Sequence, residues 1–268
     1  MQVTLGRTGI TVDKNGFGAL PIQRVGMDEA CRILRRAYAG GIRYFDTARF
    51  YTDSEQKIGA ALADVRAEIY IAGKTMATCV ADFWRDLGES LSQLGTDYID
   101  VYQFHNPPFC PKPNDGTGLY EAMLEARAKG LIRYIGFTNH RLALATEAVE
   151  SGLYDILQFP FSYLADEKEE ALVRLCAERD VGFVCMKALA GGLINRADAA
   201  YAHLAEYPVL PIWGIQRMEE LEEFLSFREA PPRTYHCQNS RIYLLRILCI
   251  LIDKPEETGF HSISKDNH

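Results

Sequence analysis

The sequence lacks several features that would place it in a membrane or outside the cell. It has no run of about 20 apolar residues, the length that a membrane-spanning helix requires, and its longest apolar stretch, 242–252, is interrupted by Arg246. No long apolar core precedes the first charge, so no secretory signal is visible. Seven cysteines occur without any C-x-x-C spacing. They predict reduced thiols in a cytoplasmic protein, without a disulfide framework or a metal site.

Positive charge is also scarce. The chain has 29 Lys and Arg residues against 36 Asp and Glu residues, which gives a formal net charge of −7. Binding to nucleic acid or to an anionic membrane over a broad surface needs clustered cations, so we expect neither as a partner. The remaining composition, 48% hydrophobic and 24% charged over 268 residues, is that of a globular protein. It does not specify an oligomeric state.

A regular alternation of short apolar strands and amphipathic helices begins at residue 16 and continues to about residue 230. Strands are predicted at 16–20, 44–46, 69–74, 99–105, 132–138, 156–158, 182–187 and 209–213, and helices are predicted to start near residues 27, 53, 79, 118, 141, 166, 197 and 217. Helical crossovers imply parallel strands. Eight such units predict a (β/α)₈ TIM barrel. The alternative, a doubly wound sheet, usually has a G-x-G-x-x-G turn after its first strand, and none follows here.

Two segments flank the predicted barrel. Residues 3–5 and 10–12 lie on either side of two glycines and predict an N-terminal β-hairpin. After Pro231 and Pro232 the alternation stops. We therefore expect a barrel domain over residues 1–233 and a divergent C-terminal tail over 234–268, helical or partly disordered.

Titratable side chains recur at the ends of neighbouring predicted strands. Asp46 ends one strand and Tyr51 follows it, Lys74 ends the next strand, and His105 ends the one after that. Active sites of this barrel class lie at the C-terminal ends of the strands, so we expect the four side chains to share one bowl. Each alone could be structural, as a helix cap, a surface residue or a hydrogen-bonded core residue. Their joint placement favours catalysis.

The chemistry that these four side chains support is protonation of a developing alkoxide. A free tyrosine has a pKa of about 10, and an adjacent Lys74 ammonium is expected to lower the pKa of Tyr51. Asp46 can hold Lys74 in place, and a neutral His105 can donate a hydrogen bond to a substrate carbonyl. No side chain supplies hydride, so a nicotinamide cofactor is expected.

These motifs resemble those of the aldo-keto reductase family. The match includes Lys74, Gln103-x-His105, the stretch 131–139, and Gly41-x-Arg43-x-x-Asp46-Thr47-Ala48-x-x-Tyr51-x-x-x-Glu55-x-x-x-Gly59. The resemblance covers about residues 1–230 and implies a barrel that binds NAD(P)H without a Rossmann fingerprint. It implies that Tyr51 is the general acid, that Asp46 and Lys74 tune it, and that His105 orients the carbonyl.

The resemblance also implies a cofactor site. The nicotinamide carboxamide would meet Thr138, Asn139 and Gln158; the pyrophosphate would lie under the loop containing Leu189, Gly191 and Gly192; and the adenosine end would meet Gln216 and Arg217. Met186 stands near the position of a tyrosine that stacks on nicotinamide in many members. NADPH is the expected cofactor, with NADH possible because Glu220 replaces a residue that is commonly basic in NADPH-preferring members.

The stretch 211–217 resembles bacterial members that carry a C-terminal iron–sulfur module. Cys237 and Cys249 are too few and too far apart for that module, so we expect no cluster. The expected function is reversible NAD(P)H-dependent reduction of an aldehyde or ketone, with a small carbonyl compound as the partner. The alternative is a catalytically weak NAD(P)H-binding sensor or assembly subunit, which Met186 and the divergent tail favour. The substrate pocket could be walled by Phe109 together with Trp84 or Trp213.

Overall fold

The structure is a computed structural model that describes residues 1–232 of the 268. The predicted tail, with Cys237 and Cys249, lies outside the described residues. The assignment of domains at residue 233 therefore stays a prediction.

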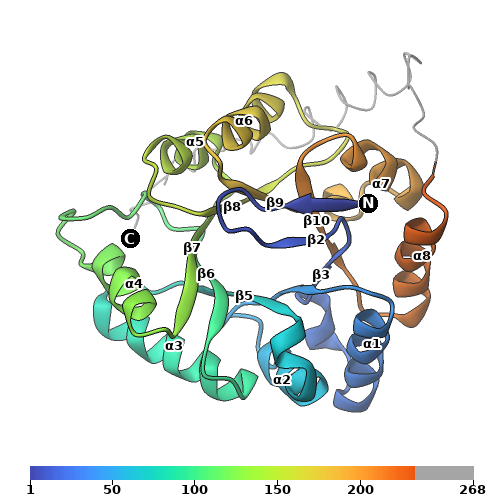
Figure 1. The fold of residues 1–268 in the computed structure, drawn as a ribbon, viewed down its shortest axis with the longest axis horizontal. Helices are drawn as coiled ribbons and strands as arrows, with labels where there is room; N and C mark the ends of the chain where they lie inside the picture. The colour runs from blue at the N-terminus through green and yellow to red at the C-terminus, as the bar shows by residue number, and fades with distance from the viewer. Residues whose placement is uncertain (233–268) are drawn as a thin grey trace, which may run out of the picture. The chain divides into compact units, whose positions relative to one another are not determined.

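Eight parallel strands within residues 1–232 close into a barrel (Figure 1). Their order around the barrel is β10-β3-β4-β5-β6-β7-β8-β9, so neighbours in sequence are neighbours in space. The strands are β3 (Gly16–Gly18), β4 (Tyr44–Asp46), β5 (Tyr70–Thr75), β6 (Ile99–His105), β7 (Ile132–Thr138), β8 (Ile156–Pro160), β9 (Gly182–Met186) and β10 (Val209–Gly214). The predicted (β/α)₈ TIM barrel is confirmed.

The helices surround the barrel and begin within a residue of their predicted starts. They are α1 (Met27–Ala39), α2 (Ser54–Leu62), α3 (Val80–Leu94), α4 (Leu119–Ala128), α5 (Leu142–Glu150), α6 (Glu167–Glu178), α7 (Ala197–Ala205) and α8 (Met218–Glu229). The start of α6 is set by a capping box in which Asp166 accepts the N–H of Glu169, and the Glu169 side chain accepts the N–H of Asp166. None of the helices in residues 1–232 combines the length and the apolar character needed to cross a membrane.

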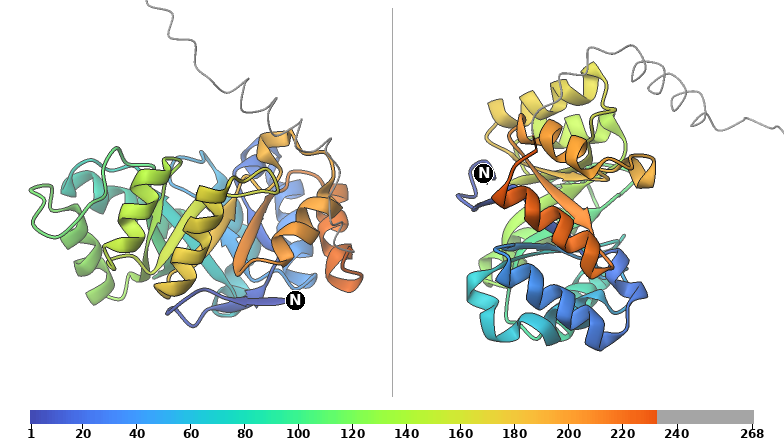
Figure 2. Two further views of the ribbon diagram at one scale, coloured as in Figure 1. Left: turned by 90° about the horizontal axis from the view of Figure 1, so that it is seen from above. Right: turned by 90° about the vertical axis from the view of Figure 1, so that its right-hand side faces the viewer.

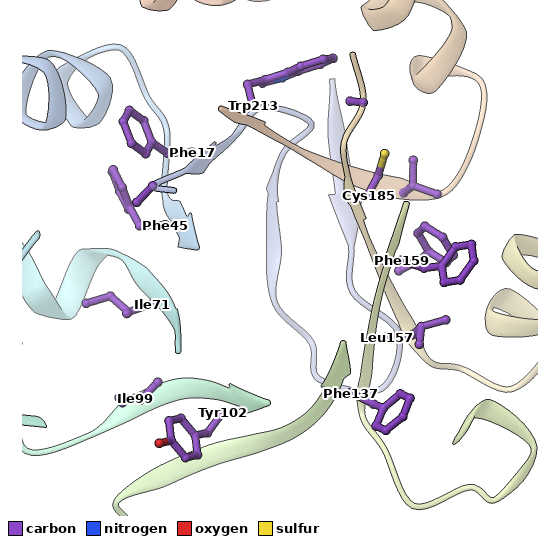
Figure 3. Close-up of a cluster of buried hydrophobic side chains, with 14 of the residues drawn as sticks. Phe17, Phe45, Ile71, Ile99, Tyr102, Phe137, Leu157, Phe159, Cys185 and Trp213 are labelled. Atoms are coloured by element: carbon purple, nitrogen blue, oxygen red, sulfur yellow. The ribbon is translucent and has the colours of Figure 1, made fainter. Parts of the chain in front are cut away.

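The main hydrophobic core lies between the strands and the surrounding helices. Phe17, Phe45, Tyr102 and Phe137 point outward from the barrel into this layer (Figure 3). Trp213 does the same from β10, where it is 1% exposed and stacks on Phe224 of α8 with ring centroids 4.2 Å apart. The suggestion that Trp213 walls the substrate pocket is therefore wrong, because alternate side chains of a strand face opposite sides and this one faces the helices.

The barrel interior changes character along the strands. Its N-terminal half is filled by an apolar plug to which the barrel contributes Tyr44, Ala72, Val101, Ile156, Val184 and Leu210. The hairpin of β1 (Gln2–Thr4) and β2 (Thr11–Asp13) packs onto this plug through Val3, Leu5, Ile10 and Val12 and lies across the end of the barrel at which the strands begin (Figure 2). Two residues further along four of these strands the inward side chain is polar: Asp46, Lys74, Gln103 and Gln158. The strand period of two therefore separates a structural end of the barrel from a chemical one.

Candidate active site

Lys74 and Asp46 form a buried ion pair between β5 and β4. The Lys74 ammonium lies 2.7 Å from both Asp46 carboxylate oxygens and 2.7 Å from the Thr47 carbonyl oxygen. Lys74 is 0% exposed and Asp46 is 2% exposed. The ammonium is thus held between Asp46 at the end of β4 and the Thr47 carbonyl that follows it.

The loop after β4 carries Tyr51 and is held against the end of β5. The N–H groups of Thr47 and Arg49 donate to the carbonyl oxygens of Ala72 and Lys74, at 2.8 Å and 3.0 Å. Arg49 also pairs with the buried Glu55 at the start of α2. These contacts continue the β4–β5 pairing beyond the strands and place the Tyr51 ring with its centroid 5.2 Å from the Lys74 ammonium.

His105 completes the group from the end of β6. Its ring meets the Tyr51 ring edge to face, with centroids 5.8 Å apart. Its Nδ1 is buried and has no hydrogen-bond partner among the described residues. The structure thus brings together the four side chains that were predicted to share the bowl.

Burial has the largest effect on the pKa values of these groups. It lowers the pKa of His105 to about 3, and the positive charge of Lys74 acts in the same direction, so the imidazole is neutral at pH 7. Burial raises the pKa of Asp46, and the Lys74 ammonium opposes that rise. Burial also raises the pKa of Tyr51 above its ordinary value, because the opposing effect of Lys74 is smaller. Lys74 does act to lower the Tyr51 pKa, as expected. Burial outweighs it, so the expectation that the Tyr51 pKa falls below its ordinary value is wrong.

A chain of amides crosses the barrel interior beside the ion pair. The Thr138 hydroxyl donates to Gln103 Oε1 at 2.9 Å, and Gln103 Nε2 donates to Gln158 Oε1 at 2.9 Å. All three side chains are 1% exposed or less. Gln103 belongs to the Gln103-x-His105 motif but is not among the predicted site residues. Its position two residues before His105, on the same face of β6, is the signal that could have identified it.

Two other predicted cofactor residues have well-defined surroundings. Asn139 donates from Nδ2 to the Pro107 carbonyl oxygen at 3.0 Å and accepts from the Arg141 N–H at 2.9 Å, so it joins the loops after β6 and β7. Met186 ends β9 inside the barrel, in the apolar interior cluster, and is 9% exposed.

The loop after β9 adopts backbone conformations that suit its glycines. Leu189 is half-buried, and the turn η3 (Ala190–Gly192) follows it with Gly191 at φ +68° and Gly192 at φ +97°. A Cβ atom at either glycine would meet nothing within 4 Å, so the constraint there is backbone conformation and not space.

Arg217 is already paired with an acidic side chain at the start of α8. Its Nε lies 2.8 Å from Glu220 Oε1, while Glu220 Oε2 accepts the N–H groups of Gln216 at 3.0 Å and Arg217 at 3.2 Å. A carboxylate therefore lies where the resemblance puts the adenosine end of the cofactor.

A second imidazole lies near the site and was not foreseen. His140 follows Asn139, and its Nδ1 lies 3.4 Å from the Lys187 ammonium beyond the end of β9. Within residues 1–232, no three His, Cys, Asp or Glu side chains converge in the manner of a metal site.

The comparison with known proteins identifies the family. The profile of the aldo/keto reductase family matches residues 14–206. The chain belongs to this family. This aldo/keto reductase is 28% identical over 220 residues to L-galactose dehydrogenase of Arabidopsis thaliana, a match covering 75% of this chain and 69% of that protein. It is 37% identical over 120 residues to the methylglyoxal reductase DkgB of Escherichia coli O157:H7, covering 41% of this chain and 42% of that protein.

Solved structures of family members share the fold. The aldo-keto reductase AKR11C1 from Bacillus halodurans, in its holo form, superposes with a TM-score of 0.75 at 23% identity, covering 93% of this chain and 95% of that one. The thermostable aldo-keto reductase Tm1743, in complex with the inhibitor epalrestat, gives a TM-score of 0.71 at 26% identity, covering 92% and 99%. The chain is thus an oxidoreductase of a family that reduces carbonyl compounds and generally uses NAD(P)H.

Proposed function

We propose that this enzyme reversibly reduces an aldehyde or ketone to an alcohol, with hydride from NADPH or NADH and a proton from Tyr51. The observation that supports this proposal is the buried group at the ends of β4, β5 and β6. There the Lys74 ammonium binds Asp46 and lies 5.2 Å from the Tyr51 ring centroid. An acid, a cation that stabilises its conjugate base and a neutral imidazole are the parts that protonation of an alkoxide requires.

The protein side chains would act as follows. Tyr51 gives its phenolic proton to the substrate oxygen as negative charge develops there, and the Lys74 ammonium stabilises the phenolate that is left. Asp46 keeps Lys74 in place through two 2.7 Å hydrogen bonds. His105, neutral at pH 7, donates a hydrogen bond that orients the carbonyl. NAD(P)H, when bound, supplies the hydride.

The residues present suit a nicotinamide dinucleotide. Thr138 and Gln158 carry a hydroxyl and an amide that can meet a carboxamide, and the open space beside Gly191 and Gly192 leaves room for a phosphate to approach the backbone, where the Gly192 N–H donates to the Leu189 carbonyl oxygen at 2.9 Å. We propose that the cofactor is held by Thr138, Asn139, Gln158, Met186, Leu189, Gly191, Gly192, Gln216 and Arg217. No iron–sulfur cluster is proposed.

Substitution of Tyr51 by Phe tests the proton donor. We expect Tyr51→Phe to lower kcat by about 10²–10⁴-fold, because the general acid is lost while the ring that fills the site remains. Fluorescence titration should give an unchanged Kd for the cofactor. The matched control is Tyr134→Phe, which removes a half-buried hydroxyl that donates to the Thr8 carbonyl oxygen in the hairpin, at 2.6 Å, and should leave kcat unchanged.

The same assays separate the proposal from its alternative. Turnover is followed as the loss of NAD(P)H absorbance with a panel of aldehydes and ketones. A wild-type protein that binds cofactor but turns over none of them would support the weakly catalytic sensor or assembly subunit. A Tyr51→Phe variant with wild-type kcat would show that another group donates the proton.

A further inference from the structure

The hydrogen bonds across the barrel interior run in one direction, from Thr138 to Gln103 and from Gln103 to Gln158. A carboxylate held by an ammonium can only accept hydrogen bonds. Gln158 opposes the rise that burial causes in the Asp46 pKa, which fits a Gln158 NH₂ group directed toward the carboxylate. The Gln158 carbonyl oxygen faces Gln103 and accepts a hydrogen bond from Gln103 Nε2 at 2.9 Å.

Gln103 in turn sets the orientation of the Thr138 hydroxyl. With its NH₂ group committed to Gln158, Gln103 presents its carbonyl oxygen to Thr138, whose hydroxyl must donate to it at 2.9 Å. The Thr138 oxygen is therefore left as an acceptor only, and the Gln158 NH₂ group is left as a donor. An acceptor and a donor side by side complement a primary carboxamide, which offers one N–H pair and one carbonyl oxygen.

A glycine on the neighbouring strand leaves space for the Gln103 side chain. Gln103 on β6 pairs in register with Gly136 on β7, and a Cβ atom at Gly136 would lie 2.6 Å from Gln103 Cγ. Glycine in the interior of a strand is unfavourable and often marks a close approach of another group. Here the approaching group is the side chain that joins Thr138 to Gln158.

We propose that Gln103, seated against Gly136, is a positioning residue that sets Thr138 as acceptor and Gln158 as donor, and so selects a carboxamide on the nicotinamide ring. This inference rests on the proposed function, because it takes Thr138 and Gln158 as the carboxamide site. Gln103 orients these groups and does not contact the reacting atoms.

The test compares ligands that differ only at the carboxamide. The Kd values of the oxidised dinucleotide, of its 3-acetylpyridine analogue and of the matching ADP-ribose are measured by calorimetry for wild type and Gln103→Met. The analogue lacks the N–H that Thr138 would accept. We expect the wild type to prefer the dinucleotide over the analogue by about tenfold, the effect of one such hydrogen bond. In Gln103→Met the Thr138 hydroxyl is free to rotate, so this preference should fall below about twofold.

Two controls separate positioning from general damage. ADP-ribose lacks the nicotinamide, so its Kd should be the same in wild type and Gln103→Met. Asn15→Leu removes another buried amide, one that bonds the Phe224 carbonyl oxygen at 3.0 Å, and should leave the ligand preference intact. If Gln103→Met does not fold, Gly136→Ala replaces it, because the added methyl displaces Gln103 and should also reduce the preference.

The outcomes are distinct. A wild-type preference that persists in Gln103→Met, or in Gly136→Ala when that variant replaces it, overturns the inference. So does an equal loss of affinity for ADP-ribose and for the dinucleotide. A wild-type protein that binds no nicotinamide dinucleotide overturns the proposed function itself, and this inference with it, before any variant is compared.

Discussion

Substitution of Lys74 by Met is expected to destabilise the protein strongly and for an identifiable reason. The change removes the three 2.7 Å hydrogen bonds of the ammonium and leaves Asp46, which is 2% exposed, without its counter-ion. Removing one partner of a buried ion pair costs about 3–5 kcal/mol, because the other charge stays buried. We expect a loss of that size in the free energy of unfolding, measured by urea denaturation at pH 7.

The chain offers a matched control in Lys57, a second buried lysine. Lys57 is 2% exposed, and its ammonium lies 2.8 Å from Asp53 Oδ1 and 3.1 Å from the Ile22 carbonyl oxygen. The Asp53 side chain is 44% exposed, so water can solvate it when the lysine is gone. The Ile22 carbonyl also keeps the N–H of Val25. Lys57→Met should therefore cost only about 1 kcal/mol.

A double variant assigns the cost to the orphaned carboxylate. Asp46→Asn combined with Lys74→Met should be about 2 kcal/mol more stable than Lys74→Met alone, because no buried charge remains. Burial raises the pKa of Asp46, so the stability deficit of Lys74→Met relative to wild type should also shrink as the pH falls and the carboxyl group is protonated. If Lys57→Met and Lys74→Met cost the same, and the double variant recovers nothing, the reasoning fails.

Two further predictions concern His105 and Glu220. The pKa of His105 is lowered to about 3, so the unfolded chain binds its proton first, and the stability that His105 contributes at pH 7 is lost as the pH falls below its unfolded pKa of about 6.5. Between pH 7 and pH 5 this loss amounts to about 2 kcal/mol. In His105→Gln, the decrease in the free energy of unfolding from pH 7 to pH 5, measured by urea denaturation, should therefore be smaller by about that amount. Glu220→Gln should lower the KM for NADPH several-fold and leave that for NADH unchanged, because it frees Arg217 for a 2′-phosphate. Equal changes for both cofactors in initial-rate assays would show that Glu220 does not discriminate between them.

The barrel could be predicted because its elements follow simple local rules. Short apolar strands such as 99–105 and 132–138 alternate with amphipathic helices, and the observed helix starts follow the predicted ones closely. The convergence of Asp46, Lys74 and His105 was also predictable, since the ends of parallel neighbouring strands must meet.

What could not be predicted depends on burial and on partners distant in the sequence. The net rise of the Tyr51 pKa is a balance between desolvation and Lys74, and the sequence shows only the second. Gln103 acquires its place from Gly136 and Gln158, 33 and 55 residues away. Trp213 belongs to a strand that was correctly predicted, but whether its side chain points into the barrel or toward the helices depends on the register of β10 against β3.

The upward shift of the Tyr51 pKa fits the proposed role better than the expected downward one. A proton donor must carry its proton when the substrate arrives, and burial keeps Tyr51 protonated at pH 7. If the Lys74 ammonium had prevailed in the resting enzyme, part of the population would be phenolate and unable to donate. In the proposed mechanism Lys74 acts when the proton leaves, because the charge that would then develop on Tyr51 lies beside an ammonium already held by Asp46 and desolvated with it. On this proposal the buried pair is stable at rest and would stabilise the phenolate only during proton transfer.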